Sequence, residues 1–172
     1  MYYHNITTDD MLNGSGLRVC LWCSGCEHHC ESCQNPQTWN EKSGIEFDID
    51  AENELFEKLE KDYISGITFT GGDPLHNNNV KKVNELCEKV KSDFPTKNIW
   101  VYTGYLFENI INKTECSEED VYRRNIIFKT DVLVDGRFEK DKASVNYPWA
   151  GSTNQRVIDV QKTLEIGKIV LF

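Results

Sequence analysis

Residues 17–39, LRVCLWCSGCEHHCESCQNPQTW, form the stretch that most constrains the structure of this chain. The apolar run from Leu17 to Trp22 predicts a strand, which leads directly into a loop with cysteines at positions 26, 30 and 33. The spacing of Cys26, Cys30 and Cys33, CxxxCxxC, suits a four-iron four-sulfur (4Fe-4S) cluster, because a short loop can hold three of its corners. The fourth iron would then have no protein ligand, so the stretch predicts an iron-sulfur centre with an open site.

The spacing alone leaves other ligand sets open. Zinc usually takes four ligands, commonly from two CxxC or CxxH pairs, and no second pair follows downstream. Cys20 and Cys23 could nevertheless supply a fourth ligand, and His28 and His29 lie between the loop cysteines. A structural zinc site and a loop of inert cysteines are therefore alternatives to the cluster.

Composition narrows the class of protein. A chain of 172 residues is long enough for one domain, so we expect a single unit over residues 1–172. The net charge of −9 and a pI near 4.9 disfavour direct binding of nucleic acid, and no apolar stretch is long enough to cross a membrane. The seven cysteines are odd in number and no signal peptide precedes them, which favours the reducing cytoplasm over a disulfide-bonded compartment.

Short apolar strands alternate with amphipathic helices along the chain. We expect strands at residues 17–22, 66–70, 99–102 and 132–134, helices at 50–63 and 79–94, and a weaker helical region at 106–124. Because this alternation implies right-handed parallel crossovers, it predicts an α/β fold. The tail, residues 159–172, is expected to contribute only a last strand.

Glycine follows each of the four predicted strands. The residues are Gly25, Gly71 with Gly72, Gly104 and Gly136. Turns often need glycine for its backbone freedom alone. However, the carboxyl ends of parallel strands share one edge of the sheet, and α/β enzymes bind their ligands at that edge. The cysteine loop opens on the same edge, which favours a ligand site there.

Four segments together resemble a known family. NGSGLRVCLWCSGCEHHCESCQNPQTW and TFTGGDP are followed, in family order, by VDGRFEKD and GSTNQR. In this combination the chain resembles the radical S-adenosylmethionine activases, and among them the activating proteins of anaerobic (class III) ribonucleotide reductases. The resemblance covers roughly residues 13–156 and selects the cluster from the alternatives above.

The resemblance implies a partial (β/α) barrel of parallel strands, open on one side, and a specific chemistry. Cys26, Cys30 and Cys33 would hold the 4Fe-4S cluster, and the methionyl amino and carboxylate groups of S-adenosylmethionine would bind the fourth iron. One electron would cleave S-adenosylmethionine to methionine and a 5′-deoxyadenosyl radical, which abstracts hydrogen from a glycine of the partner enzyme. The cofactors carry this chemistry, so we expect no general acid, base or nucleophile from the chain.

The resemblance also implies the contacts of S-adenosylmethionine. The backbone of Gly71, Gly72 and Asp73 would meet the methionyl amine. The other expected contacts lie on the cysteine loop and after the fourth strand: Ser32 and Gln34 against the adenine or methionine portion, and Asp135 and Arg137 on the ribose and carboxylate.

The partner implied is the large subunit of anaerobic ribonucleotide reductase, whose glycine loop would enter the open side of the barrel. The chain has no additional ferredoxin-like cysteine sets, so an external donor such as flavodoxin or ferredoxin would supply electrons. Alternatives are an activase of another glycyl-radical enzyme such as pyruvate formate-lyase, a zinc-stabilised binding module and an iron-sulfur electron carrier.

The remaining cysteines and the two histidines are expected to have no role in ligation. Cys20, Cys23 and Cys87 are predicted to be small core side chains. His28 and His29 are predicted to be exposed to solvent.

Overall fold

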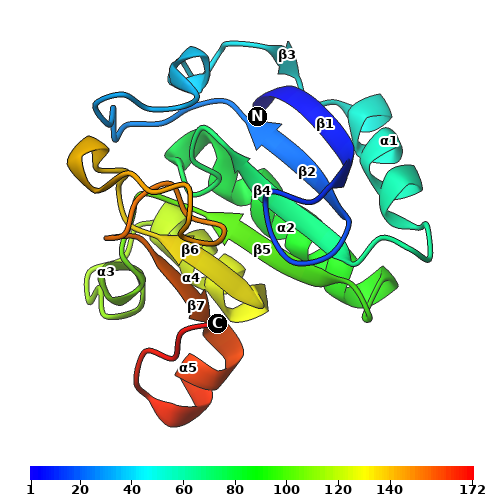
Figure 1. Ribbon diagram of the computed structural model, residues 1–172. Helices are drawn as coiled ribbons and strands as arrows, with labels where there is room; N and C mark the ends of the chain where they lie inside the picture. The colour runs from blue at the N-terminus through cyan, green and yellow to red at the C-terminus, as the bar shows by residue number, and fades with distance from the viewer.

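The computed structural model describes residues 1–172, which form one mixed β-sheet with helices packed against it (Figure 1). The sheet has seven strands in the order β3-β1-β2-β4-β5-β6-β7. The strands are β1 (Tyr2–Asp10), β2 (Arg18–Cys23), β3 (Ile45–Glu46), β4 (Gly66–Gly71), β5 (Asn98–Tyr102), β6 (Val132–Asp135) and β7 (Arg156–Asp159). The two ends of the sheet are β3 and β7, so the barrel is open, as predicted.

Five helices connect or follow the strands. They are α1 (Ile49–Leu59), α2 (Asn77–Asp93), α3 (Phe107–Ile111), α4 (Glu118–Lys129) and α5 (Val160–Ile166). In Figure 1, α2 and α4 lie side by side behind the sheet, while α1 lies beside β1 and β2. The alternation of β2, β4, β5 and β6 with helices confirms the predicted α/β class.

The four predicted strands all form, and they are the parallel part of the sheet. β2, β4, β5 and β6 pair in parallel, in that order. The sheet as a whole is mixed, because β1 and β3 pair antiparallel on one side of these strands and β7 on the other. These outer strands are half exposed, so their sequences carry a weaker apolar pattern.

Two predicted segments differ in the structure. The helical region predicted at 106–124 is two helices, α3 and α4, because a capping box at Ser117 starts a new helix that runs on to Lys129. The tail begins with the helix α5, and only its end pairs with β7, through an isolated antiparallel bridge between Leu171 and Ile158. Asp159 caps α5 by accepting from the backbone N–H of Lys162, and Gly167 ends the helix in the left-handed region at φ 73°.

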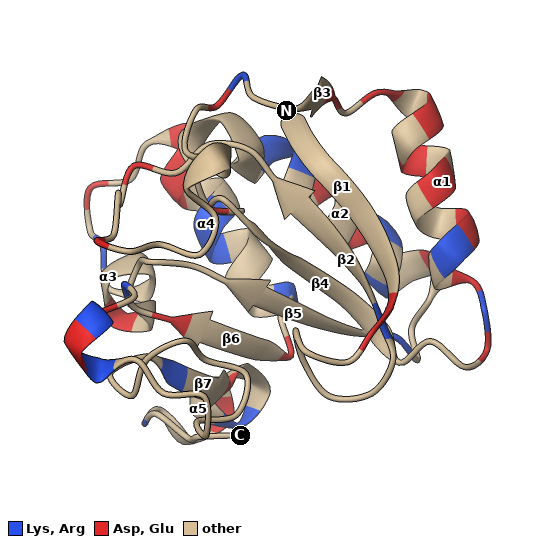
Figure 2. Ribbon diagram, turned by 45° about the horizontal axis from the view of Figure 1, so that its top comes forward, with Lys and Arg blue, Asp and Glu red and all other residues tan.

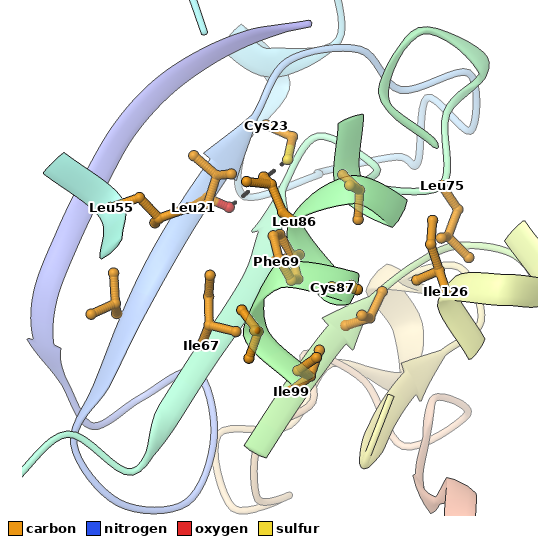
Figure 3. Packing of buried hydrophobic residues seen from close by; sticks show 14 of the residues in the cluster. Leu21, Cys23, Leu55, Ile67, Phe69, Leu75, Leu86, Cys87, Ile99 and Ile126 are labelled. Carbon is orange, nitrogen blue, oxygen red and sulfur yellow. Dashed lines mark hydrogen bonds between the residues drawn. The ribbon is translucent and has the colours of Figure 1, made fainter. Parts of the chain in front are cut away.

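The main core lies between the sheet and the helices (Figure 3). Most residues of the apolar stripes predicted for the two long helices are buried: Leu55, Phe56, Leu59, Val80, Val83, Leu86 and Val90. Phe94 is partly buried, but Tyr63, predicted at the end of the first stripe, lies beyond α1 and is exposed. Cys23 and Cys87 belong to this core, and Cys20 is fully buried as well. The prediction that these three cysteines are core side chains is confirmed.

The other face of the sheet forms the inside of the half-barrel. A smaller cluster of Trp100, Val132, Val134 and Val157 lies there, and Trp149 packs against it from the segment before β7. That segment therefore covers part of the inner face.

Buried Arg18 holds the amino-terminal ends of the parallel strands together. Its guanidinium donates to Thr68 Oγ1 at 2.7 Å, to the carbonyl of Ile67 at 2.7 Å and to Asn98 Oδ1 at 2.6 Å. Burial lowers the pKa of Arg18 to about 10, which leaves it charged at neutral pH. This end of the barrel is therefore filled by protein, and the opposite end is left for a ligand.

Charged residues lie mainly outside the sheet. Figure 2 shows Asp and Glu concentrated on the helices and connecting turns, while the strands carry few charges. No helix has both the length and the apolar character needed to span a membrane.

Candidate cofactor site

A pocket of about 370 Å³ lies at the carboxyl ends of the parallel strands. Its wall combines the cysteine loop after β2, the glycine-rich end of β4 and the turns after β5 and β6. This is the edge at which the sequence predicted a ligand site. The parallel register of the strands brings these segments together although they are far apart in the chain.

The three loop cysteines all line this pocket and are half buried. The remaining four are elsewhere, with Cys20, Cys23 and Cys87 in the interior and Cys116 on the surface. No three His, Cys, Asp or Glu side chains lie close enough together to hold a single metal ion. The pocket is therefore lined by the three cysteines predicted to hold the cluster and by none of the other four.

The cysteine loop is held at both ends of its turn. The N–H of Gly25 donates to the carbonyl of Thr38 at 2.7 Å, and that of Cys26 donates to Trp39 at 3.1 Å. Within the loop, the N–H of Asn35 donates to Cys33 Sγ at 3.3 Å. Burial, followed by the charge of Asp73, raises the pKa of Cys26 to about 11.

His28 also lines the pocket, and its Nδ1 is buried without a partner in the protein. Buried polar atoms normally have a hydrogen-bond partner. A wall with three thiols and one unpartnered nitrogen fits a group that completes it, and so the residues present fit the predicted cluster and cofactor.

The glycine pair at the end of β4 packs directly on the start of the cysteine loop. The N–H of Gly72 donates to the carbonyl of Cys23 at 2.8 Å, and that of Asp73 donates to Gly25 at 2.7 Å. Because these N–H groups are already used, a ligand amine, which donates, would have to use the carbonyl oxygens of this segment.

The carboxylate of Asp73 is buried and fully engaged by the protein. Its Oδ2 accepts from His28 Nε2 at 2.7 Å, from Thr103 Oγ1 at 3.0 Å and from the N–H of Gly104 at 3.0 Å. Its Oδ1 accepts from the N–H of Leu75 at 2.8 Å. The backbone carbonyl of Asp73 is engaged as well, because it accepts from Asn79 Nδ2 at 2.9 Å and from the N–H of His76 at 3.0 Å. The predicted contact of Asp73 with the cofactor therefore stays a prediction.

The predicted exposure of His28 is wrong, because the residue is only 8% exposed and is bound to Asp73. The turn after β5 covers it, with the ring of Tyr105 4.7 Å away in an edge-on arrangement. His29 is exposed, as predicted, and its ring lies against Trp39 at 4.8 Å.

The turn after β6 places Arg137 at the pocket, whereas Asp135 is buried behind it. Asp135 accepts from Arg156 Nη2 at 2.5 Å and from the N–H of Phe107 at 2.8 Å. Arg137 is exposed and forms no ion pair, and it is the only Lys or Arg that lines the pocket. An uncommitted cation suits a carboxylate ligand, while the predicted cofactor contact of Asp135 stays a prediction.

Of the two polar residues predicted on the cysteine loop, Gln34 lines the pocket. Ser32 is exposed, adopts φ 58° and lies outside the pocket lining. Its contact with the cofactor also stays a prediction.

Gln155 lines the pocket but was not among the predicted site residues. Its Oε1 accepts from the N–H of Gly151 at 3.0 Å, and its Nε2 donates to the carbonyl of Gly136 at 2.9 Å. It thereby fixes the turn before β7 on the end of β6. The GSTNQR segment was the available signal, because it contains both Gly151 and Gln155.

Residues 12–158 match the family model described as the 4Fe-4S single cluster domain. Together with the open half-barrel and the cysteine-lined pocket, this match defines the class: a radical S-adenosylmethionine protein with one 4Fe-4S cluster.

Similar proteins define the family more narrowly. The anaerobic ribonucleoside-triphosphate reductase-activating protein of Enterobacteria phage T4 is 40% identical over 157 residues, which cover 91% of this chain and 93% of that protein. The proteins of the same name from Pasteurella multocida and Escherichia coli K12 are 38% and 35% identical, over 90% and 91% of this chain and 95% and 97% of their own lengths. The chain belongs to the family of anaerobic ribonucleoside-triphosphate reductase-activating proteins.

Proposed function

We propose that this protein cleaves S-adenosylmethionine reductively and generates a glycyl radical on anaerobic ribonucleotide reductase. The observation that carries the proposal is the placement of Cys26, Cys30 and Cys33 in one pocket with the glycine end of β4. The similarity to activating proteins of that reductase, over nine-tenths of the chain, supports the choice of partner. When bound, the cluster and S-adenosylmethionine supply the electron transfer and the abstraction of a hydrogen atom from glycine.

The residues of the chain bind and orient these groups. Cys26, Cys30 and Cys33 would each hold one iron, which leaves the fourth for the methionyl group. The backbone of Gly71, Gly72 and Asp73 would contact the methionyl amine, with the carbonyl oxygens of the two glycines as acceptors. Arg137, the cation that lines the pocket, would bind the methionyl carboxylate of S-adenosylmethionine.

The other contacts proposed for the cofactor are those of Gln34, Ser32 and Asp135. No residue of the pocket is needed as an acid or base. The one histidine and the one carboxylate that line it, His28 and Asp73, are bonded to each other.

The partner's glycine loop is proposed to enter through a hollow of about 780 Å³ beside the cofactor pocket. The hollow shares Leu12, Gln34, Tyr102 and Gly151 with that pocket, so it leads directly to the cofactor site. Its outer wall includes the exposed apolar residues Met11 and Val145. Exposed apolar side chains grouped beside a reaction site suit a macromolecular substrate.

Electrons are proposed to come from a separate protein such as flavodoxin or ferredoxin. Outside the cysteine loop, three cysteines are buried in the interior and one is on the surface, so they cannot form the ligand set of a second cluster. Seven free thiols are consistent with the reducing cytoplasm as the compartment.

The function is tested by anaerobic reconstitution with iron and sulfide. The wild-type protein should bind about four irons, release 5′-deoxyadenosine after reduction with S-adenosylmethionine, and produce a glycyl radical signal by electron paramagnetic resonance when the reductase is added. Cys30→Ala should lose the cluster and all cleavage, because only two loop ligands remain. Cys116→Ala, on the surface, should behave as wild type.

Other outcomes would identify the alternatives. A glycyl radical formed on pyruvate formate-lyase but not on the reductase would identify pyruvate formate-lyase as the partner enzyme. An iron-containing protein without 5′-deoxyadenosine would be an electron carrier, and stoichiometric zinc with no bound iron would exclude the proposal.

A further inference from the structure

We propose that His28 is a positioning residue, which fixes the cysteine loop against the ends of β4 and β5 through Asp73 and so sets the geometry of the cofactor site. This inference rests on the proposed function, since it concerns the same site. It assigns a role to a side chain that is neither a cluster ligand nor a predicted contact of the cofactor.

The first observation is the hydrogen bond between two buried side chains. His28 Nε2 lies 2.7 Å from Asp73 Oδ2, and the side chains of His28 and Asp73 are only 4% and 2% exposed. An ionised carboxylate only accepts hydrogen bonds, so Nε2 carries the proton that is donated. The carboxylate itself is held by Leu75, Thr103 and Gly104. His28 is thus tied to an anchor that other elements hold in place.

The second observation is the close packing of the imidazole ring of His28 against Gly104. A Cβ atom on Gly104 would lie 2.3 Å from His28 Cδ2, so only glycine leaves room for the ring at this position. Tyr105 packs edge-on against the ring at 4.7 Å. Gly104 and Tyr105 follow β5, more than seventy residues after His28 in the chain.

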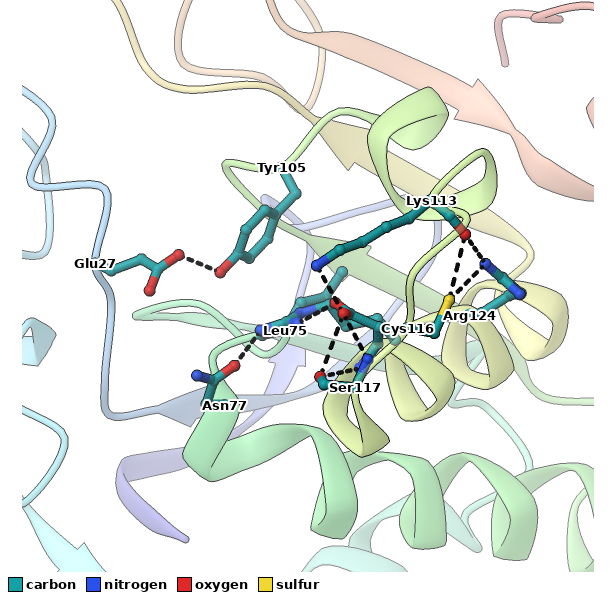
Figure 4. Close-up of polar contacts among 10 residues, drawn as sticks. Glu27, Leu75, Asn77, Tyr105, Lys113, Cys116, Ser117 and Arg124 are labelled. Carbon is teal, nitrogen blue, oxygen red and sulfur yellow. Dashed lines mark hydrogen bonds and ion pairs between the residues drawn. The ribbon is translucent and has the colours of Figure 1, made fainter.

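The third observation is that the neighbouring loop residue is anchored by the same turn. Tyr105 Oη donates to Glu27 Oε1 at 2.5 Å, as Figure 4 shows. Arg123 lies over the face of the Tyr105 ring, with its guanidinium carbon 5.0 Å from the ring centroid. Residues 27 and 28 are therefore both fixed, whereas His29 is turned outward with φ 46°.

These contacts lie between Cys26 and Cys30. The N–H of Cys26 donates to the carbonyl of Trp39. The segment that follows Cys26 is held by the side-chain hydrogen bonds of Glu27 and His28. The distance between the two sulfurs and the β4 end therefore depends on His28. Without His28, the three thiols remain chemically competent, but their placement relative to Gly71 and Gly72 is no longer enforced.

The test compares four variants after anaerobic reconstitution. His28→Ala removes the anchor, and Gly104→Ala displaces the ring while leaving His28 and Asp73 chemically intact. His28→Gln restores a donor near the position of Nε2, and His29→Ala is the control on the exposed neighbour. The measurements are iron content, the spectrum of the reduced cluster with and without S-adenosylmethionine, and the dissociation constant of S-adenosylmethionine.

We expect His28→Ala and Gly104→Ala to retain iron, to change the spectrum of the reduced cluster and to weaken S-adenosylmethionine binding roughly tenfold. His28→Gln should recover most of the affinity, and His29→Ala should match wild type. Unchanged spectrum and affinity in His28→Ala would overturn the proposal, as would equal effects of His28→Ala and His29→Ala.

A measurement on the metal-free protein makes the test independent of cluster assembly. Alkylation followed by mass spectrometry should label Cys26 and Cys30 several-fold faster in His28→Ala, while buried Cys23 and Cys87 stay protected. Equally fast labelling of the buried pair would mean that His28 supports the whole fold, which would overturn a role in the loop. If wild type held iron but released no 5′-deoxyadenosine, the proposed function would fail, whereas spectra and labelling would still decide the role of His28.

Discussion

At the scale of single residues, the closest approach of one backbone segment to another in the cofactor pocket is at the glycine pair that ends β4. A Cβ atom on Gly72 would lie 2.6 Å from the carbonyl oxygen of Gly25 and 3.1 Å from that of Cys23. Gly71 carries the additional requirement of φ 97°. At Gly72, a side chain is therefore excluded by steric contact alone. A Cβ atom there would displace the backbone immediately before Cys26.

Gly72→Ala should lower both stability and cofactor affinity. Forcing a methyl group against backbone atoms costs about 1–3 kcal/mol, and the shift of Gly25 would move Cys26. We expect a lower free energy of unfolding in urea for the metal-free protein, and S-adenosylmethionine binding weaker by roughly tenfold after reconstitution. Binding equal to wild type would contradict this steric argument.

Gly167→Ala is the matched control. Gly167 has φ 73° at the end of α5 and no atom within 4 Å of an added Cβ, so the substitution adds backbone strain without a clash. Its stability should fall by about 1–2 kcal/mol, with S-adenosylmethionine binding unchanged.

Single residues also show what a sequence can predict about a site. The loop cysteines could be proposed as ligands because their spacing is local to one loop, and the glycines could be proposed as pocket residues because they end strands. The burial of His28 depends on Asp73, Gly104 and Tyr105, and no local pattern around His28 contains these residues. Gln155 was overlooked for the same reason, since its partner Gly136 belongs to another strand end.

At the scale of elements, α4 is defined by a capping box that also forms the base of a polar cluster (Figure 4). Asp120 Oδ2 accepts from the N–H of Ser117 at 3.1 Å, and Lys113 Nζ lies 2.6 Å from the same oxygen. Arg123 Nη1 donates to Asp120 Oδ1 at 2.7 Å. Burial opposes ionisation of Asp120, but these donors outweigh burial and lower its pKa to about 2.

Asp120→Asn should destabilise the protein in a pH-dependent manner. The folded pKa of about 2 lies below the ordinary value of 3.8, so the carboxylate stabilises the fold above about pH 4 and loses this effect as the pH falls toward 2. We expect the variant to be less stable by about 1–2 kcal/mol at pH 7. In urea unfolding the gap from wild type should narrow below pH 4. A gap that stays constant from pH 7 to pH 3 would refute the assignment, and Glu115→Gln, on the exposed turn before α4, should show no effect.

Elements differ in how well their sequences predict them. Apolar residues recur at clear helical periods in α1 and α2 and at strand periods in the central strands, because one face of each helix and the strands themselves are buried in the core. β1 buries only Tyr3 and Ile6 and ends in polar residues, so it lacked such a pattern. The tail ends in the apolar residues IVLF, which favoured a strand, although Asp159 and Gly167 were available as helix boundaries. Antiparallel pairing at the edges is set by contacts with other strands, which local sequence does not encode.

At the scale of the whole molecule, the half-barrel is closed at the end held by Arg18 and open beside the cofactor pocket. Two segments border the opening: the turn between β1 and β2, with exposed Met11 and Leu12, and the segment before β7, with fully exposed Val145. The chain has a net charge of −9, yet the residues lining this hollow carry no charge. An uncharged, partly apolar entrance suits recognition of a polypeptide loop by shape and apolar contact.

Val145→Asp should separate activation of the reductase from cleavage of the cofactor. Val145 lines the outer hollow but not the cofactor pocket, so an added carboxylate would be desolvated only when the partner binds. At limiting protein concentration we expect roughly tenfold less glycyl radical on the reductase, with unchanged 5′-deoxyadenosine release in the absence of the reductase. Val121→Asp provides the matched control, because Val121 is an exposed valine on α4 outside the hollow and its substitution changes the net charge equally. Equal loss of radical in both variants would assign the effect to charge alone, and full activation by Val145→Asp would exclude this hollow as the entrance.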